Sequence, residues 1–527
     1  MLAVKPQLVF YRGHTHGELS FPPSFPIAKT IGDWCRKFLT EKEFIPEGYR
    51  WNKELHCRVK TFAHWELTKQ YCFYDRKTMR LHVPIGFADD LKQLVENNGG
   101  VVKELPLPGY PMAPLKSKIK PGFSDRPWQV ELIEKCSEKT PGMKGLNMQV
   151  GKGKTYSAIR SALNLGYATM VIVPGLVDQW LDSFMEFTPM KCKSGELYKI
   201  TGFDSINRLA KCPGFRPAVF VASTRTMQMF CNKEENYGML PWTFEQFFKT
   251  YGIGCKIIDE CHKNFHANTM MDLRLNVPYN LYCSATFSQT NKHAREIFVK
   301  IFPKSMRYGA SAYDRYTRVF MYQYSGEVDE RKCIKHKGYM HAKYEHELLH
   351  SDRKLTSHIM NNIVPRINEH YVERFKPGYK MLLFCSSIEF IEAVAKKLKD
   401  IYKDFRVITY TGSDKQEKLK SGDIIVTNMS KAGTGLDLKN LITSINTVSL
   451  RSEVLAEQVL GRLRKMDNEE VRFIDMFDVN LQSHIRHADE RRELWQSICS
   501  KYQEEKIFPD FGVVSGSQSS IPSFGFF

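Results

Sequence analysis

The chain has 527 residues, which is too many for one hydrophobic core, so several domains are expected. An apolar fraction of 42% suits ordinary globular cores, and a formal net charge of +18 favours a polyanionic partner. Nucleic acid comes before a membrane surface because no basic amphipathic anchor is present; a solvated basic surface is the alternative. The sequence has no apolar run long enough for a signal peptide or a membrane span, which predicts a soluble, intracellular protein.

The thirteen cysteines show no pair at the CxxC spacing typical of metal sites. Cys255, Cys283 and Cys385 each lie inside an apolar run, where a thiol acts as a small hydrophobic side chain. We therefore expect reduced, structural cysteines.

Residues 1–120 predict a small accessory domain of mixed α and β structure, followed by a linker. Short apolar runs such as "QYCFYD" and "LHVPIGF" favour strands, and "ADDLKQLVENNGG" predicts a helix that ends at its glycine pair. The stretch "LPLPGYPMAPLKSKIKPG" is rich in proline and lysine and is typical of a linker.

The rest of the chain predicts two α/β units in tandem. Continuous apolar runs such as "TMVIVP" and "GCKIIDE" alternate with helical segments over 121–305, and "KMLLFCSS", "GDIIVTNMS" and "VRFIDMFD" continue the pattern over 346–505. Such runs favour parallel strands that are buried on both faces. Residues 306–345 are predicted to be a basic connector, and 506–527 a flexible tail.

The stretch "QVGKGKT" predicts a phosphate-binding loop between a strand and a helix. The backbone N–H groups of such a loop hold a triphosphate, to which Gln149, Gly151, Lys152 and Gly153 would contribute. Lys154 would bridge the β- and γ-phosphates and the Thr155 hydroxyl would bind Mg²⁺. The full GxxxxGK[ST] pattern has glycine where this chain has Met148, so a solvated Gly/Lys turn stays open as the alternative.

An apolar strand that ends in Asp259 and Glu260 decides between these alternatives. The pair follows the loop at a spacing that brings both to the carboxyl edge of one parallel sheet, where ligands bind. There Asp259 is predicted to hold Mg²⁺ and Glu260 to orient and deprotonate the attacking water. The sequence therefore predicts a site for ATP and Mg²⁺.

The order of the motifs resembles that of superfamily 2 helicases of the DEAD/DEAH type. "QVGKGKT", "DECH" and "SAT" resemble motifs I to III, "LLFCSS", "NMSKAGTGLDL" and "EQVLGRLRK" resemble motifs IV to VI, and "DRPWQ" resembles the adenine-recognition segment. The resemblance implies two RecA-like domains and an ATP-dependent motor. It assigns adenine recognition to Gln129, the coupling of hydrolysis to movement to Ser284 and Thr286, and nucleotide contacts to Gly435 and Asp437.

The last motif departs from the family pattern. The resemblance implies that Arg462 stabilises charge on the γ-phosphate, but the position of the second family arginine holds Lys465, and Arg464 lies one residue earlier. A planar, permanently charged guanidinium suits this role better than an ammonium group, so Arg462 is the first candidate and Arg464 the second.

The N-terminal order of an aromatic segment, "RLHVPIGF", a helix and a linker is similar to that of UvsW-type helicases of tailed phages. This similarity implies a helicase or branch-migrating translocase on single-stranded or branched DNA in replication, recombination or repair, and the host cytoplasm as its location if a phage encodes it. An RNA helicase or transcript-release factor is the first alternative. A nucleic-acid clamp with a decayed ATPase is the second, although Lys154, Asp259, Glu260 and Arg462 argue against it.

The tail "VSGSQSSIPSFGFF" ends on aromatic residues that need a covering partner. Gln518, Ile521 and Phe524 resemble the QxxIxxF part of a sliding-clamp-binding peptide, although Gly525 stands where a second aromatic residue is usual. We therefore expect a sliding clamp as a partner, and docking of the tail on its own motor stays open as the alternative.

Overall fold

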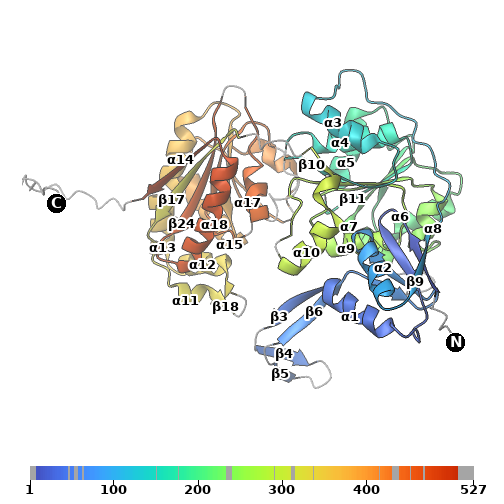
Figure 1. Ribbon diagram of the computed structural model, residues 1–527. Coiled ribbons are helices and arrows are strands. Elements are labelled where there is room, and N and C mark those ends of the chain that lie inside the picture. The colour runs from blue at the N-terminus through green and yellow to red at the C-terminus, as the bar shows by residue number, and fades with distance from the viewer. Residues whose placement is uncertain are drawn as a thin grey trace, which may run out of the picture. The chain divides into compact units, whose positions relative to one another are not determined.

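The computed structural model shows two compact units, the first mainly residues 1–314 and the second mainly residues 315–527 (Figure 1). The structure describes residues 7–45, 48–52, 57–61, 64–149, 151–175, 177–232, 240–289, 291–309, 315–335, 338–412, 414, 416–429, 438–451, 453–466 and 469–507.

The N-terminal region of the first unit is built on one mixed sheet. Its strands follow the order β7-β8-β2-β1-β9, and all neighbours are antiparallel except β1 and β9. The elements are β1 (Gln7–Arg12), β2 (His16–Ser20), α1 (Ala28–Phe38), β7 (Phe73–Asp75), β8 (Arg80–Pro84), α2 (Ala88–Asn97) and β9 (Val101–Pro106). Two hairpin-like pairs lie between α1 and β7, namely β3 (Thr40–Ile45) with β6 (His64–Gln70) and β4 (Gly48–Asn52) with β5 (Cys57–Thr61).

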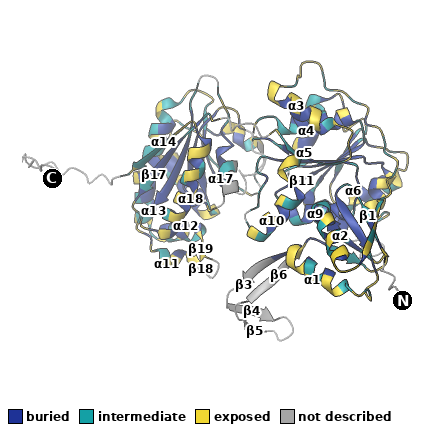
Figure 2. Cartoon of the chain, in the orientation of Figure 1, coloured by how far each residue is buried: buried dark blue, intermediate teal, exposed yellow. Residues whose placement is uncertain are grey.

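The first α/β domain contains a parallel sheet of seven described strands in the order β12-β13-β11-β14-β15-β10-β16. The strands are β10 (Gly142–Asn147), β11 (Thr169–Val173), β12 (Leu197–Ile200), β13 (Val219–Ser223), β14 (Cys255–Ile258), β15 (Tyr279–Ser284) and β16 (Arg307–Tyr308). The helices are α3 (Pro127–Ser137), α4 (Lys154–Leu165), α5 (Val177–Phe187), α6 (Phe203–Lys211), α7 (Thr224–Asn232), α8 (Phe244–Thr250), α9 (Phe265–Asp272) and α10 (Lys292–Ile301). Every residue of β11, β14 and β15 is buried, as the continuous apolar runs predict (Figure 2).

The second unit contains another parallel sheet of seven described strands, in the order β21-β22-β20-β23-β24-β17-β25. The strands are β17 (Thr317–Tyr324), β20 (Lys380–Cys385), β21 (Val407–Tyr410), β22 (Ile424–Asn428), β23 (Leu441–Asn446), β24 (Val471–Asp478) and β25 (Lys501–Lys506), beside a small hairpin of β18 (Ile334–Lys335) and β19 (Gly338–Tyr339). The helices of this unit are α11 (Glu330–Cys333), α12 (His341–Leu349), α13 (Asp352–His358), α14 (Val364–His370), α15 (Ile388–Ile401) and α18 (Gln482–Ile498). Helix α17 (Glu453–Leu460) comes between β23 and β24 in sequence, and its residues from Val454 on are grouped with the first unit. Tandem RecA-like α/β domains with a small N-terminal α+β region are therefore the fold, as predicted.

The segment expected to be a basic connector differs from that expectation. β17 pairs with β24 along its whole length and with β25 on its other side, so it lies inside the second sheet. Six of its eight residues are buried. The second α/β unit therefore begins before residue 346, and the hairpin β18–β19 and α12 belong to it as well.

The N-terminal region shares a hydrophobic core with the first α/β domain. One buried cluster runs from Phe10 and Leu19 of the N-terminal sheet to Met170 and Phe298 of the α/β domain. The ring of Tyr71 packs against that of Phe265 with their centroids 5.1 Å apart. The N-terminal region is therefore fixed to the first α/β domain by apolar packing.

Two further expectations concern the cysteines and membrane spans. Cys255, Cys283 and Cys385 are buried in their strands, as their apolar surroundings predict. Across the residues that the structure describes, no helix combines the length and apolar character that crossing a bilayer requires.

Candidate nucleotide site

The predicted phosphate loop lies between β10 and α4. Gly153 is the residue before α4 and has a φ of 88°, in the left-handed region that glycine adopts without strain. A Cβ atom at this position would lie 2.4 Å from Nε2 of Gln129, so a side chain there would displace the Gln129 amide as well as strain the backbone. The loop therefore delivers Lys154 and Thr155 to the first turn of α4, where backbone N–H groups are unpaired and attract anions.

The structure brings Lys154 together with the predicted carboxylate pair. Its Nζ lies 3.3 Å from Oδ1 of Asp259 and also contacts Oε1 of Glu260. Both carboxylates follow β14 at the carboxyl end of the parallel sheet, where ligands of α/β folds bind. Glu260 has a φ of 47°, a left-handed conformation that is rare for a residue with a side chain. Such strain is typical of functional sites.

The electrostatics of this cluster couple its three charges. Burial alone would lower the pKa of Lys154, but Asp259 and Glu260 outweigh it and hold that pKa above the ordinary value. Burial would raise the pKa of Glu260, and the positive charge of Lys154 reverses the shift and lowers it. A carboxylate with a lowered pKa is a poor proton acceptor. Without Lys154 beside it, Glu260 would therefore be a stronger base.

Two residues that sequence reasoning missed hold the carboxylates in place. Trp180 of α5 donates its indole N–H to Oδ2 of Asp259 at 3.0 Å. His262 places Nδ1 3.5 Å from Oε2 of Glu260 and 2.8 Å from Oγ of Ser284, and burial lowers the pKa of His262 to about 4. Trp180 follows the apolar run "TMVIVP" and His262 ends "DECH", but neither contact follows from spacing alone.

Ser284 connects this cluster to the next strand. It ends β15, and its hydroxyl accepts the backbone N–H of Thr286 at 2.9 Å while it also contacts the Thr286 carbonyl oxygen at 2.6 Å. Ser284 is thus one contact from His262 and two contacts from Glu260. The geometry supplies a path for the coupling role predicted for Ser284 and Thr286, which stays a prediction.

Gln129 lies against the phosphate loop from α3. Its Nε2 donates to the carbonyl oxygens of Lys152 at 3.2 Å and Gly153 at 3.4 Å, and its Oε1 accepts the N–H of Arg126 at 2.9 Å. The indole N–H of Trp128 also reaches the Lys152 carbonyl oxygen at 3.2 Å. The side chain predicted to read the base is therefore tied to the loop predicted to hold the phosphates.

The remaining predicted residues are placed as follows. Gln149 accepts the N–H of Lys152 through its carbonyl oxygen at 3.2 Å, within the loop. Arg462 is buried and Arg464 half-buried, both just after α17, and their roles stay predictions. Gly435 and Asp437 lie outside the described residues, as do Gln518, Ile521 and Phe524 of the tail.

The donor set fits the Mg²⁺ ion that the motifs imply. The Asp259 carboxylate and the Thr155 hydroxyl offer hard oxygen atoms, which this ion prefers. The N–H donors of Trp180 and Glu260 occupy one lone pair on each Asp259 oxygen, at 3.0 Å in both cases, and Lys154 lies 3.3 Å from Oδ1, so Mg²⁺ would take the place that the ammonium group holds at this carboxylate. Asp259 and Thr155 are thus the residues that would hold Mg²⁺.

The segment that contains this site is similar to one known protein family. Residues 122–289 match the family described as "Type III restriction enzyme, res subunit". The resemblance to superfamily 2 helicases is confirmed. The matched segment contains the phosphate loop, Asp259, Glu260 and Ser284; it begins after the N-terminal region and ends before α10 and β16.

The chain is also similar, at low identity, to several solved structures. The protein titled Mss116p bound to ssRNA and AMP-PNP is 14% identical over 72% of this chain and 74% of its own, with a TM-score of 0.48. T4 UvsW is 14% identical over 95% of this chain and 100% of its own, with a TM-score of 0.35. Dbp5 of S. cerevisiae, titled as bound to RNA and ADP BeF3, is 11% identical over 72% and 94%, with a TM-score of 0.45. No curated protein sequence matches the chain.

Proposed function

We propose that this protein is an ATP-driven translocase or helicase that acts on single-stranded or branched DNA. The observation that carries the proposal is the cluster of Lys154, Asp259 and Glu260 beside the phosphate loop, linked through His262 to Ser284. The net charge of +18 supports a nucleic-acid partner. The choice of DNA rests on the UvsW-like order of the N-terminal segments.

Lys154 has two alternative partners in this proposal. Without nucleotide it neutralises Asp259 and Glu260, and the arriving phosphates compete for its ammonium group. Asp259 then helps to hold Mg²⁺, which supplies charge neutralisation at the phosphates when it is bound. Glu260, released from Lys154, accepts the proton of the attacking water.

The path from Glu260 to Ser284 carries the state of the nucleotide away from the reaction centre. A change at Glu260 alters its contact with His262, which in turn holds Ser284 at the end of β15. We propose that Ser284 and Thr286 use this path to couple hydrolysis to movement on the nucleic acid. Arg462, with Arg464 as the second candidate, would stabilise charge on the γ-phosphate.

The decisive experiment compares ATPase rates with single-stranded DNA, forked DNA, a four-way junction and RNA of matched length. DNA should stimulate the rate more than RNA, and branched DNA should be the better substrate for strand separation. A larger stimulation by RNA would replace the DNA proposal with the RNA alternative. Equal rates with and without any nucleic acid would remove the motor proposal itself.

A further inference from the structure

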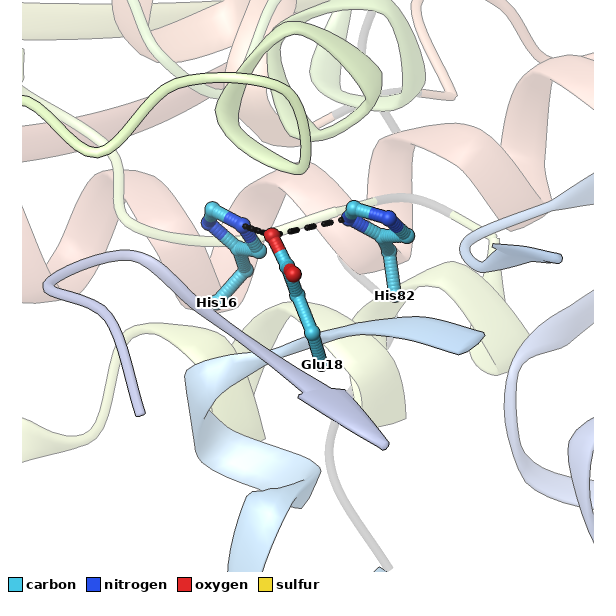
Figure 3. Close-up of side chains that lie close together, drawn as sticks. All are labelled: His16, Glu18 and His82. Atoms are coloured by element: carbon cyan, nitrogen blue, oxygen red, sulfur yellow. Dashed lines mark hydrogen bonds and ion pairs between the residues drawn. The ribbon is translucent and has the colours of Figure 1, made fainter. Parts of the chain in front are cut away.

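Three side chains of metal-binding type meet on one face of the N-terminal sheet. Glu18 of β2 and His82 of β8 are direct partners across antiparallel strands, and His16 precedes Glu18 by two residues on the same strand. Because side chains alternate along a strand, all three project from the same face. Figure 3 shows both imidazole rings turned toward the carboxylate of Glu18.

The cluster is buried and converges on one oxygen atom. His16 is 2% exposed and Glu18 8% exposed, and the side chain of His82 is 11% exposed. Oε1 of Glu18 lies 3.2 Å from Nε2 of His16 and 3.5 Å from Nδ1 of His82. One nitrogen from each ring and one oxygen therefore enclose the same small space, with all three atoms within 4.8 Å of one another.

These separations suit a tetrahedral zinc ion. Zinc binds imidazole nitrogen and carboxylate oxygen at about 2.0–2.1 Å, so neighbouring ligands of a tetrahedral site lie about 3.3–3.4 Å apart. The two distances to Oε1 of Glu18 fall on either side of this value. Two histidines and one glutamate leave a fourth position for water.

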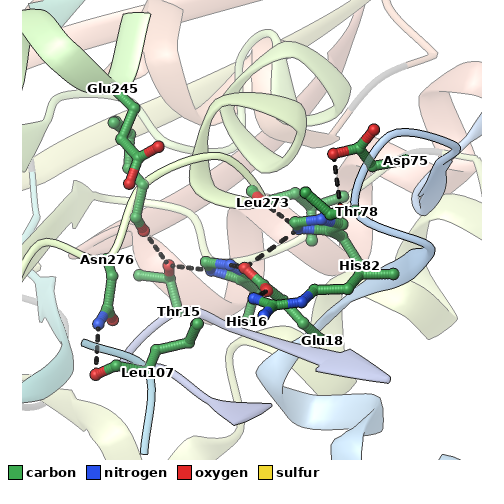
Figure 4. A network of polar contacts seen from close by, with 12 residues as sticks. Thr15, His16, Glu18, Asp75, Thr78, His82, Leu107, Glu245, Leu273 and Asn276 are labelled. Carbon is green, nitrogen blue, oxygen red and sulfur yellow. Dashed lines mark hydrogen bonds and ion pairs between the residues drawn. The ribbon is translucent and has the colours of Figure 1, made fainter. Parts of the chain in front are cut away.

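The surroundings of the cluster join the N-terminal sheet to the first α/β domain (Figure 4). Nδ1 of His82 lies 3.0 Å from the carbonyl oxygen of Leu273, and the Thr15 hydroxyl donates to the carbonyl oxygens of Asp272 at 3.0 Å and Leu275 at 3.1 Å. All three proposed ligands belong to the N-terminal sheet, so a cation at this place would tie β2 to β8. A carbonyl oxygen only accepts hydrogen bonds, so zinc on Nδ1 of His82 would displace the proton that this nitrogen donates to Leu273.

Arg80 competes with a cation for the same carboxylate. Its Nη1 lies 2.7 Å from Oε2 of Glu18, the oxygen that the histidines do not share. Its guanidinium also lies over the ring of Tyr11, 4.0 Å from the centroid. The positive charge of Arg80 opposes a second cation beside Glu18, so it sets the affinity of the site without occupying it.

We propose that His16, Glu18 and His82 form a zinc site that ties β2 to β8 within the N-terminal sheet. Its role is structural, because the cluster is buried and its neighbours are main-chain carbonyl groups of the segment 272–275. The site is independent of the nucleotide site and of the proposed motor activity.

The test uses the full-length, untagged chain in a background that removes competing surface ligands. His346, Glu347 and His350, on and just after α12, also lie within reach of one another, and both histidines are exposed, so His346→Ala with His350→Ala is the control background. After chelator treatment, this variant should bind one zinc ion per chain and unfold at a higher temperature with zinc than without. Cobalt in place of zinc should give the visible absorption of a tetrahedral site.

Substitutions at the cluster separate a zinc site from a plain ionic network. In this background, Glu18→Gln should abolish zinc uptake. Arg80→Met should lower the melting temperature of the zinc-free protein, bind zinc more tightly and regain the lost stability when zinc is added. If the control background takes up no zinc and shows no thermal shift with excess zinc, the proposal is wrong. Retention of one zinc ion after Glu18→Gln would also overturn it. The cobalt spectrum is measured on the control background alone, so the proposal can be tested even if a variant at the cluster does not fold.

Discussion

Replacing Trp180 by Phe tests whether the orientation of Asp259 limits hydrolysis. The change removes the indole N–H that lies 3.0 Å from Oδ2 of Asp259 and keeps an aromatic ring at this buried position. A hydrogen bond to a charged group contributes about 1.5–3 kcal/mol. Because about 1.4 kcal/mol corresponds to a tenfold change in rate, the maximal ATPase rate should fall at least about tenfold. The Glu260 N–H still holds Oδ1 of Asp259, which favours the lower end of this range.

The assay is steady-state ATP hydrolysis with saturating single-stranded DNA at varied Mg²⁺ concentration. The Mg²⁺ concentration for half-maximal rate should rise, because a carboxylate that is free to rotate binds the ion less well. Trp128→Phe is the matched control, since its indole N–H reaches a neutral carbonyl oxygen and the residue is 45% exposed. A folded Trp180→Phe protein with the same rate and the same Mg²⁺ dependence as the parent would refute the role of this contact.

Three other outcomes are expected. Lys154→Ala should abolish ATP binding in a fluorescent-nucleotide titration, whereas Glu260→Gln should bind ATP and lose hydrolysis by a hundredfold or more, about 3 kcal/mol; wild-type hydrolysis by Glu260→Gln would disprove its role as base. Burial lowers the pKa of His358 to about 4 from its ordinary value of 6.5, so the unfolded chain binds more protons below pH 6.5 and stability should be lost between about pH 6.5 and 4. His358→Gln should flatten the dependence of the melting temperature on pH in this window, and an unchanged slope would exclude His358 as a contributor. Deleting residues 1–115 should lower the melting temperature and cause aggregation, because it uncovers the core cluster that these residues share with the first α/β domain; a monomeric fragment as stable as the parent would contradict the shared core.

The sequence predicts the buried strands well and the edge strands poorly. β11, β14 and β15 are continuous apolar runs, a pattern that predicts strands buried on both faces, and all their residues are buried. β25, by contrast, reads "KYQEEK" and lies at the edge of its sheet, where charged side chains reach solvent. β17 lies in a segment whose basic character suggested a connector, and only its pairing with β24 and β25 reveals it as a strand.

The candidate site also contains residues that the sequence predicts and residues that it does not. Lys154, Asp259 and Glu260 follow from local patterns, because a glycine loop and a strand end each leave a signature in sequence. The contacts of Trp180 and His262 depend on how separate elements pack, and no local pattern contains that information. The cluster of His16, Glu18 and His82 is hidden for a related reason, since it requires the pairing of β2 with β8.

The core that the N-terminal region shares with the first α/β domain also bears on how such a protein can change over generations. A Cβ atom at Gly86, just before α2, would lie 2.1 Å from the carbonyl oxygen of Lys300 in α10, so the two backbones touch with no side chain between them. An N-terminal region packed in this way cannot be exchanged between related proteins as an independent domain. Substitutions on either side must be accepted in compensating pairs, and chimeras joined near residue 120 should fail unless both faces come from one parent.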